Sequence, residues 1–283
     1  MAEFGKAQLG DARLNRRLIR LADHLTDHPT ASIPQACGGW SETQGAYRFF
    51  DQAREGKRGL GWQDVLAPHM GQTEARMRAH RVVLCLQDTT ELDYNGQRIN
   101  GLGPLSYESQ RGMHLHPTYA VSAQREPLGI LDLWMWAREP KAPDGERPGV
   151  LESRRWIEGY ERVAERAGTM PDTRLVYVAD READILALMR RAQVLGHPAD
   201  WLIRAQHNRC LPEGGKLWTA ALAGDALGEI EFTLPARHNR PARTVRQAMH
   251  SRMVQIADGE GATLPVTCLI AQEIGAPAGV API

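Results

Sequence analysis

The sequence lacks several features that mark whole classes of protein. Only four of its 283 residues are cysteines, widely spaced and without a CxxC pair, so neither a disulfide framework nor a zinc site is expected. No apolar run approaches the roughly 20 residues of a membrane span, and the N-terminus lacks the basic and apolar segments of a secretory signal. Lysine and arginine balance aspartate and glutamate at 34 each, so net charge does not indicate nucleic-acid binding. We expect reduced thiols, a cytoplasmic location and no membrane partner.

The remaining composition is that of an ordinary folded protein. Hydrophobic residues make up 42% and charged residues 24%, values typical of soluble globular chains. A chain of this length can bury a sizeable core, and it suggests one large domain with a smaller one.

Two apolar runs end in an aspartate. Residues 175–179 precede Asp180, and residues 82–87 precede Asp88. An apolar run followed by helical spacing predicts a buried strand, and the tip of such a strand commonly carries functional groups. Two carboxylates at two strand ends suggest a metal site built by folding. For either aspartate alone, a helix cap is the commoner explanation.

The first segment predicts an amphipathic helix. Asp11 can cap a helix that runs to about Asp27, before His28-Pro29 stops it. One stripe of this helix is apolar: Leu14, Leu18, Leu21 and Leu25. A second stripe is basic: Arg13, Arg16, Arg17 and Arg20. The basic stripe fits contact with DNA phosphates, although on pattern alone a solvated surface is the somewhat commoner explanation.

Two further helices are expected before the main domain. Ser41–Gln44 has the pattern of a capping box that opens one of them. Within it, Arg48 suits either a DNA contact or a surface position over the core. The other helix, at about 62–80, leads into the main domain.

The main domain alternates strands and helices. The expected strands are 81–87, 117–123, 129–137, 174–179 and 201–205. A loop at 139–148 and an amphipathic helix at 151–167 separate the third strand from the fourth. This order predicts an α/β fold.

From 206 to 271 the helical periodicity fades and glycine-punctuated β-like runs appear. They are 229–234, 243–246, 253–257 and 264–271. Arginines recur every third residue here, at 237, 240, 243 and 246. This spacing suits a loop around a DNA backbone or a solvated surface about equally.

Several polar residues near the two aspartates have weaker signals. We expect Thr89 and Thr90 to be turn residues, although they could position the strand end. Asp93 and Asp184 are expected to be exposed or capping. His114 and His116 alternate on one strand, but without further ligands a histidine pair is a weak metal signal.

Several motifs together resemble one protein family. The matching motifs, in chain order, are Leu9–Asp11, Gly45–Phe49, Gln87–Leu92, Ala179–Ile185, Trp201–Arg204 and Asn239–Arg243. They resemble the insertion sequence four family of bacterial DDE transposases along essentially the whole chain. The segment 179–185, which contains Asp180, is the longest and most specific match.

The resemblance implies a domain plan. Residues 1–60 would form a helical DNA-binding domain and 61–80 a bridging helix. Residues 81–205 would form a ribonuclease H-like core, in which the strands before Asp88 and Asp180 lie side by side, and 206–283 a β-rich insertion.

The resemblance also implies an activity, cut-and-paste DNA transposition by two-metal phosphoryl transfer. Asp88 would bridge two Mg²⁺ ions, for which Mn²⁺ can substitute, and Asp180 would hold one. The partner would be double-stranded DNA at transposon ends, in the bacterial nucleoid. Candidate DNA contacts are the four arginines of the first helix and, on the matching motifs, Arg48, Arg204, Arg240 and Arg243.

The family pattern continues past Ile283 with a third catalytic glutamate and dimerisation helices, and no segment of this chain carries them. We therefore expect a truncated transposase, inactive alone. The alternative is a non-catalytic DNA-binding remnant or a regulator of transposition. A stand-alone ribonuclease H-like nuclease is disfavoured by the arginine stripe.

Overall fold

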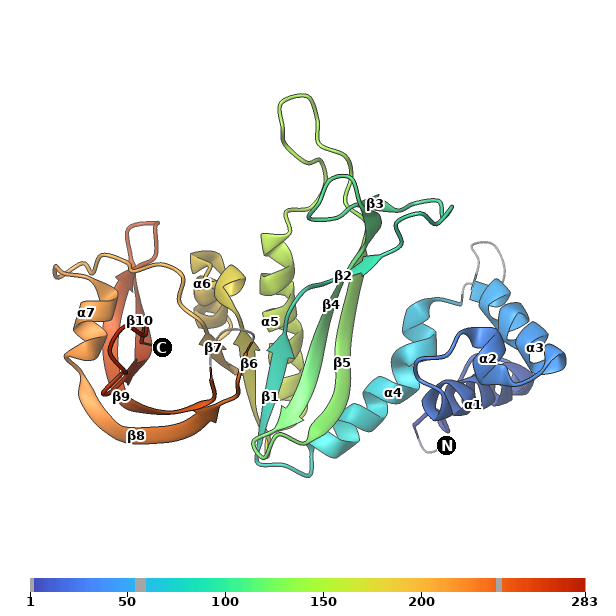
Figure 1. The fold of residues 1–283 in the computed structure, drawn as a ribbon, viewed down its shortest axis with the longest axis horizontal. Coiled ribbons are helices and arrows are strands. Elements are labelled where there is room, and N and C mark those ends of the chain that lie inside the picture. The colour runs from blue at the N-terminus through green and yellow to red at the C-terminus, as the bar shows by residue number, and fades with distance from the viewer. Residues whose placement is uncertain (1–2, 54–59, 238–240, 283) are drawn as a thin grey trace. The chain divides into compact units, whose positions relative to one another are not determined.

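A computed structural model describes residues 3–53, 60–237 and 241–282 of the chain (Figure 1). The chain divides into two compact units, Met1–Ala179 with Pro198–Leu202, and Asp180–His197 with Ile203–Ile283. The first unit contains α1 (Ala12–Asp27), α2 (Ile33–Cys37), α3 (Trp40–Phe50), η1 (Asp51–Ala53), α4 (Trp62–Met77), β1 (Val82–Gln87), β2 (Thr90–Asp93), β3 (Gly103–Pro104), β4 (Arg111–Ser122), β5 (Pro127–Trp136), α5 (Ser153–Gly168), β6 (Arg174–Ala179) and most of β7 (Asp200–Ile203). The second contains η2 (Arg181–Ala183), α6 (Leu186–Val194), α7 (Leu217–Leu222), β8 (Asp225–Leu234), β9 (Arg243–Ala257) and β10 (Thr263–Glu273).

The protein thus has the mixed α/β architecture that the sequence predicts. Over the described ranges, none of the helices has both the length and the apolar character needed to cross a lipid bilayer.

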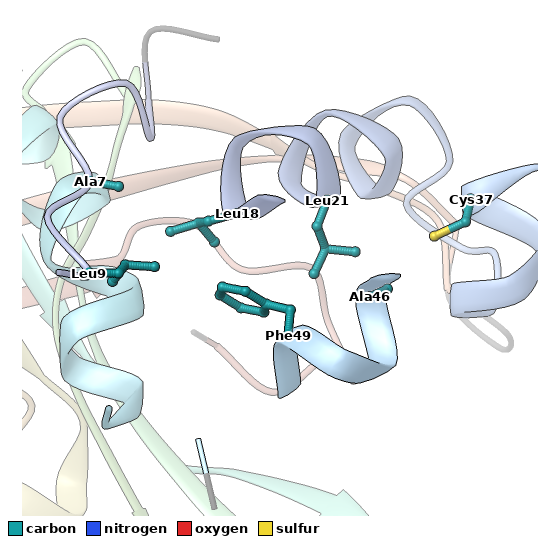
Figure 2. Close-up of a cluster of buried hydrophobic side chains, with 7 residues drawn as sticks. All are labelled: Ala7, Leu9, Leu18, Leu21, Cys37, Ala46 and Phe49. Carbon is teal, nitrogen blue, oxygen red and sulfur yellow. The ribbon is translucent and has the colours of Figure 1, made fainter. Parts of the chain in front are cut away.

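Helix α1 has the bounds that its sequence predicts. The Asp11 side chain accepts a hydrogen bond from the backbone N–H of Arg13 at 2.7 Å, which caps the first turn. Leu18 and Leu21 are 4% exposed, because the apolar stripe of α1 packs against α2 and α3. Figure 2 shows this small core: Ala7, Leu9, Leu18, Leu21, Cys37, Ala46 and Phe49.

The start of α3 differs from the prediction. The helix begins at Trp40 with Gly39 as its N-cap, so the expected capping box at Ser41–Gln44 is wrong. A box of the same S-x-x-Q pattern opens α2 instead, where the N–H of Ser32 donates to the side-chain oxygen of Gln35 at 3.1 Å. The motif occurs twice within residues 32–44, and its local pattern does not reveal which copy caps a helix.

Helix α4, expected at 62–80, packs against β5. The Nε of Arg76 donates to the carbonyl oxygen of Leu128. The N–H of Ile130 donates to His69 Nε2 at 2.9 Å. These bonds join α4 to β5.

In the sheet of the first unit, β4 pairs with β1, β2, β3 and β5, and β6 and β7 follow beyond β1. Strand β1 is antiparallel to β4 and parallel to β6. Strands β2 and β3 were not predicted, because they are four and two residues long and lack alternating apolar residues.

Strands β1 and β6 are neighbours over their whole length, with Gln87 paired to Ala179 at the end. Alternate residues of both are buried, among them Cys85 and Tyr177 at 0% exposure. The two strands that the sequence places before Asp88 and Asp180 therefore lie side by side and run in the same direction.

Helix α5 packs against β1 and β6, and Gly159 allows the helix to approach β1 closely. A Cβ atom at Gly159 would lie 2.0 Å from Nε2 of Gln87, so only glycine permits this approach. Around it, Trp156, Tyr160 and Val163 are buried.

The second unit contains a three-stranded antiparallel sheet in the order β10-β9-β8. The runs expected at 243–246 and 253–257 are parts of one strand, β9, because the polar residues between them keep extended backbone and ladder pairing. The β9–β10 turn is held by Asp258, whose side chain accepts from the N–H groups of Glu260 and Ala262. Helix α7 was not predicted.

Candidate nucleic-acid interface and carboxylate site

The basic stripe of α1 forms a surface hollow. The hollow has a volume of about 240 Å³ and is lined by Arg13, Arg16, Arg17 and Arg20. Their side chains differ in access to solvent: Arg13 is 84% exposed, Arg20 61% and Arg17 34%. Four guanidinium groups around one hollow suit contact with phosphate oxygens.

An acid from α3 partly neutralises this stripe. Glu42 accepts a hydrogen bond from Arg20 at 2.9 Å and lies 3.5 Å from Arg17 and 3.9 Å from His24. The Arg17 guanidinium also lies over Gly45, where an added Cβ would be 1.6 Å from Nη1. Arg17 therefore links the two helices.

Helix α3 presents a second exposed face beside this stripe. Trp40 and Tyr47 are 79% and 49% exposed, and Ser41, Gln44 and Arg48 are exposed with them. Their spacing places them on one side of the helix. Of this face, only Arg48 was predicted from the sequence to contact DNA.

The other arginines predicted to contact DNA lie in the second half of the chain. Arg204 is exposed. Arg243 forms a two-point ion pair with Glu273, so its guanidinium is already engaged. Arg240 lies outside the described residues. DNA contact at all three stays a prediction.

Both candidate catalytic carboxylates are exposed, and each directly follows its strand. Oδ1 of Asp88 accepts a hydrogen bond from the N–H of Thr89 at 2.8 Å. Oδ1 of Asp180 accepts from the N–H of Glu182 at 2.9 Å and caps η2. The capping role that the sequence left open for Asp180 is therefore present.

Asp184 corrects an expectation. It was predicted to be exposed or capping, yet only 5% of it is exposed. One carboxylate oxygen lies 2.6 Å from Arg209, and the other accepts from the N–H groups of Gln206 and His207. Asp184 thus organises the segment after β7. The sequence gives no local signal for this, because the partners lie more than 20 residues away.

His114 and His116 are buried among aromatic rings of β5 and α5. They are 2% and 1% exposed. The His116 ring meets Trp156 edge to face at 4.6 Å between centroids, and His114 stacks on Trp136 at 5.2 Å. Burial lowers the pKa of His116 to about 4 and also lowers the pKa of His114. The histidine pair thus lies in an aromatic part of the core, where burial disfavours the charged form of both rings.

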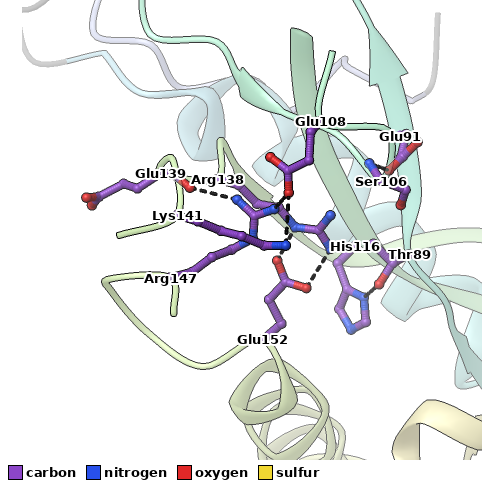
Figure 3. A network of polar contacts seen from close by, with 10 residues as sticks. All are labelled: Thr89, Glu91, Ser106, Glu108, His116, Arg138, Glu139, Lys141, Arg147 and Glu152. Atoms are coloured by element: carbon purple, nitrogen blue, oxygen red, sulfur yellow. Dashed lines mark hydrogen bonds and ion pairs between the residues drawn. The ribbon is translucent and has the colours of Figure 1, made fainter. Parts of the chain in front are cut away.

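One histidine of this core contacts the Asp88 region. Nδ1 of His116 lies 2.7 Å from the hydroxyl oxygen of Thr89 (Figure 3). The sequence analysis expected Thr89 to be a turn residue and missed this contact. The spacing of His114 and His116 on a strand indicates that both side chains lie on the same face of the sheet. It does not identify Thr89 as the partner of His116.

The loops near this contact are joined by ion pairs (Figure 3). Glu108 interacts with Lys141 and Arg147, and Glu152 with Arg138. The hydrogen bonds from Arg138 lower the pKa of the Glu152 carboxyl. Basic groups in these loops are thus paired with acids.

Within the described ranges, no cluster of three or more Asp, Glu, His or Cys side chains is placed to hold a metal ion.

A comparison with known protein families gives a match at the N-terminal end of the chain. Residues 1–54 match the family model described as transposase DNA-binding. The matched segment contains α1, α2 and α3, and with them the arginine hollow and the exposed face of α3. The N-terminal region is therefore similar to transposase DNA-binding domains, which supports a DNA-binding role related to transposition.

Proposed function

We propose that this protein binds double-stranded DNA at transposon ends through its N-terminal helices, as part of cut-and-paste transposition. The observation that carries the proposal is the coincidence of the family match with the arginine-lined hollow of α1. Arginines at this hollow would bind phosphates, which supplies affinity without reading sequence. The exposed face of α3, with Gln44 and Arg48, offers side chains suited to base edges.

The further part of the proposal is strand cleavage and transfer by the α/β core of a DDE transposase of the insertion sequence four type. What supports it is the sheet order β5-β4-β1-β6-β7, with an antiparallel first half and a parallel β1–β6 pair. This is the arrangement expected of a ribonuclease H-like core. Asp88 and Asp180 each follow one of the paired residues Gln87 and Ala179.

These two acids would hold Mg²⁺ or Mn²⁺. Exposed carboxylates with an oxygen already oriented by a backbone N–H are suitable ligands for a hard cation. When bound, the metal would supply activation of the attacking hydroxyl and stabilisation of the leaving oxygen. The chain's own contribution would be to fix the two carboxylates at adjacent strand ends.

A second function is favoured by a different observation. Where the structure describes the chain, no third ligand joins a pair of acids. A protein that occupies transposon ends without cutting them, and so regulates transposition, needs only the N-terminal interface.

The DNA-binding proposal is tested by the salt dependence of binding. Each phosphate contact contributes about 0.9 to the slope of log affinity against log salt. Replacing Arg13 and Arg16 with alanine should therefore lower the slope by up to about 1.8. Arg154→Ala on α5 removes one positive charge from an exposed site elsewhere and is the control for each single replacement, Arg13→Ala or Arg16→Ala. An unchanged slope in the double variant would reject the α1 surface.

The catalytic proposal is tested by incubating the protein with its element's terminal DNA and Mg²⁺ or Mn²⁺. Specific nicking that Asp88→Asn and Asp180→Asn each abolish, with DNA affinity retained, would support strand cleavage. Tight, specific binding with no nicking would favour the regulatory function.

A further inference from the structure

Strands β1 and β2 form one interrupted ladder along the same edge of β4. Gln87, the last residue of β1, pairs with Thr118. Thr90, the first residue of β2, pairs with Leu115. Two residues separate these pairs on each side, so the register continues across the gap without a shift. The chain leaves the ladder for two residues and then rejoins it.

Asp88 lies in this gap. The opposite side of the gap contains Pro117, which has no N–H to donate to a ladder. The break in pairing therefore falls where Pro117 could not donate a ladder hydrogen bond, and the Asp88 carboxylate is exposed there. An exposed side chain at a break in a ladder would by itself have considerable freedom.

Thr89 limits that freedom, because it contacts both sides of the gap. Its N–H donates to Oδ1 of Asp88 at 2.8 Å. Its hydroxyl oxygen lies 2.7 Å from Nδ1 of His116, on β4 (Figure 3). One residue thus connects the carboxylate to a side chain of the neighbouring strand.

His116 is a rigid anchor for this contact. The ring is 1% exposed, lies edge to face with Trp156, and has Trp136 at 6.3 Å. Because burial holds its pKa at about 4, the ring is neutral at pH 7 and does not repel a nearby cation. A neutral imidazole bonded to a hydroxyl can orient that hydroxyl without adding charge.

The residue before Asp88 is also fixed. Gln87 is buried, and its amide donates to the hydroxyl of Thr118 at 3.1 Å. The hydroxyl of Tyr177 donates to its oxygen at 2.6 Å. The main chain is thus anchored on one side of Asp88 by Gln87 and on the other by Thr89 through His116.

We propose that Thr89 and His116 are positioning residues, which hold the Asp88 carboxylate in one orientation for a divalent metal ion. This inference rests on the proposed role of Asp88 as a metal ligand. Neither residue would touch the metal. Residues that orient a ligand in this way typically change metal affinity roughly tenfold or more when replaced.

The test measures Mn²⁺ binding to the 283-residue chain from the electron paramagnetic resonance signal of free Mn²⁺. Thr89→Val removes the hydroxyl and keeps the side-chain shape, and it should weaken binding about tenfold. Thr89→Ser keeps the hydroxyl and should bind nearly as the parent does. Thr90→Val, at the exposed next residue, is the matched control and should leave binding unchanged.

The Asp88→Asn variant distinguishes the positioning role of Thr89 from the proposed role of Asp88 as a metal ligand. Weak binding in Asp88→Asn together with parental binding in Thr89→Val would overturn this inference and leave Asp88 as a ligand. Parental binding in Asp88→Asn would overturn both. Equal loss in Thr89→Val and Thr89→Ser would show that Mn²⁺ affinity does not depend on the hydroxyl, because serine keeps it, and would reject the hydroxyl contact.

A double-mutant cycle tests whether Thr89 acts through His116. In a His116→Phe background, Thr89→Val should cause no further loss of Mn²⁺ affinity, since the partner of the hydroxyl is already absent. If Thr89→Val lowers Mn²⁺ affinity in the His116→Phe background by as much as it does in the parent, His116 has no role in positioning. If His116→Phe does not fold, as judged by circular dichroism, the serine and valine variants of Thr89 alone decide the proposal.

Discussion

Glu42 of α3 accepts a hydrogen bond from Arg20 of α1 at 2.9 Å, so an acid lies within the arginine surface that we assign to DNA. We expect Glu42→Gln to raise DNA affinity at low salt, because the variant removes a negative charge that faces the phosphates. An interaction of about 1 kcal/mol corresponds to roughly a fivefold gain, measured by fluorescence anisotropy.

The gain should shrink as salt rises, since exposed charges are screened. Glu165→Gln, which removes an exposed acid from α5, serves as the control for net charge. Equal gains in both variants would assign the effect to overall charge and contradict a specific role of Glu42.

Gly159 allows α5 to approach Gln87, and its replacement should destabilise the first unit. In Gly159→Ala the new methyl group would lie 2.0 to 2.4 Å from the Gln87 amide, which is buried and held by hydrogen bonds. Overpacking of this kind costs about 1–3 kcal/mol of unfolding free energy. Urea denaturation followed by circular dichroism measures the change.

The matched control is Gly168→Ala at the end of the same helix, where an added Cβ meets nothing within 4 Å. This variant should retain parental stability or gain up to about 1 kcal/mol from helix propensity. Comparable destabilisation in both variants would show that the Gln87 contact is not the cause.

Acid should destabilise the protein through His116. Its pKa falls from an ordinary 6.5 to about 4 in the folded chain, because burial disfavours the charged ring. The unfolded chain binds a proton below about pH 6.5, whereas the folded chain does so only below about pH 4. The unfolding free energy therefore decreases as pH falls through this window, by about 3 kcal/mol in total from this residue.

His116→Gln should remove this contribution and flatten the stability profile between pH 6.5 and 4, relative to the parent. The exposed His28→Gln is the control, and its profile should follow the parental one. Chemical denaturation at a series of pH values gives both curves, and an unchanged slope in His116→Gln would contradict the prediction.

Local patterns in the sequence predicted local features of the fold well. The cap at Asp11 and the leucine spacing gave the bounds of α1, because both signals lie within the helix itself. The strand before Asp180 was predicted with its observed bounds for the same reason. The pairing of β1 with β6 could be expected only by family resemblance, since nothing in the spacing encodes it.

Features that depend on distant partners were missed. Asp184 is buried because Arg209 and two backbone amides reach it from beyond β7. The Thr89–His116 contact joins residues 27 positions apart and depends on the β4 register. Such contacts follow from the topology of the sheet, and single-residue propensities carry no information about them.

The uninterrupted register across the β1–β2 gap also constrains how this protein can evolve. A single inserted residue between Gln87 and Thr90 would turn every side chain of β2 to the opposite face or require a bulge. Relatives that share this sheet should therefore tolerate substitutions between these two strands far more readily than insertions or deletions. Selection should therefore preserve the number of residues between Gln87 and Thr90 as strictly as the identity of those residues.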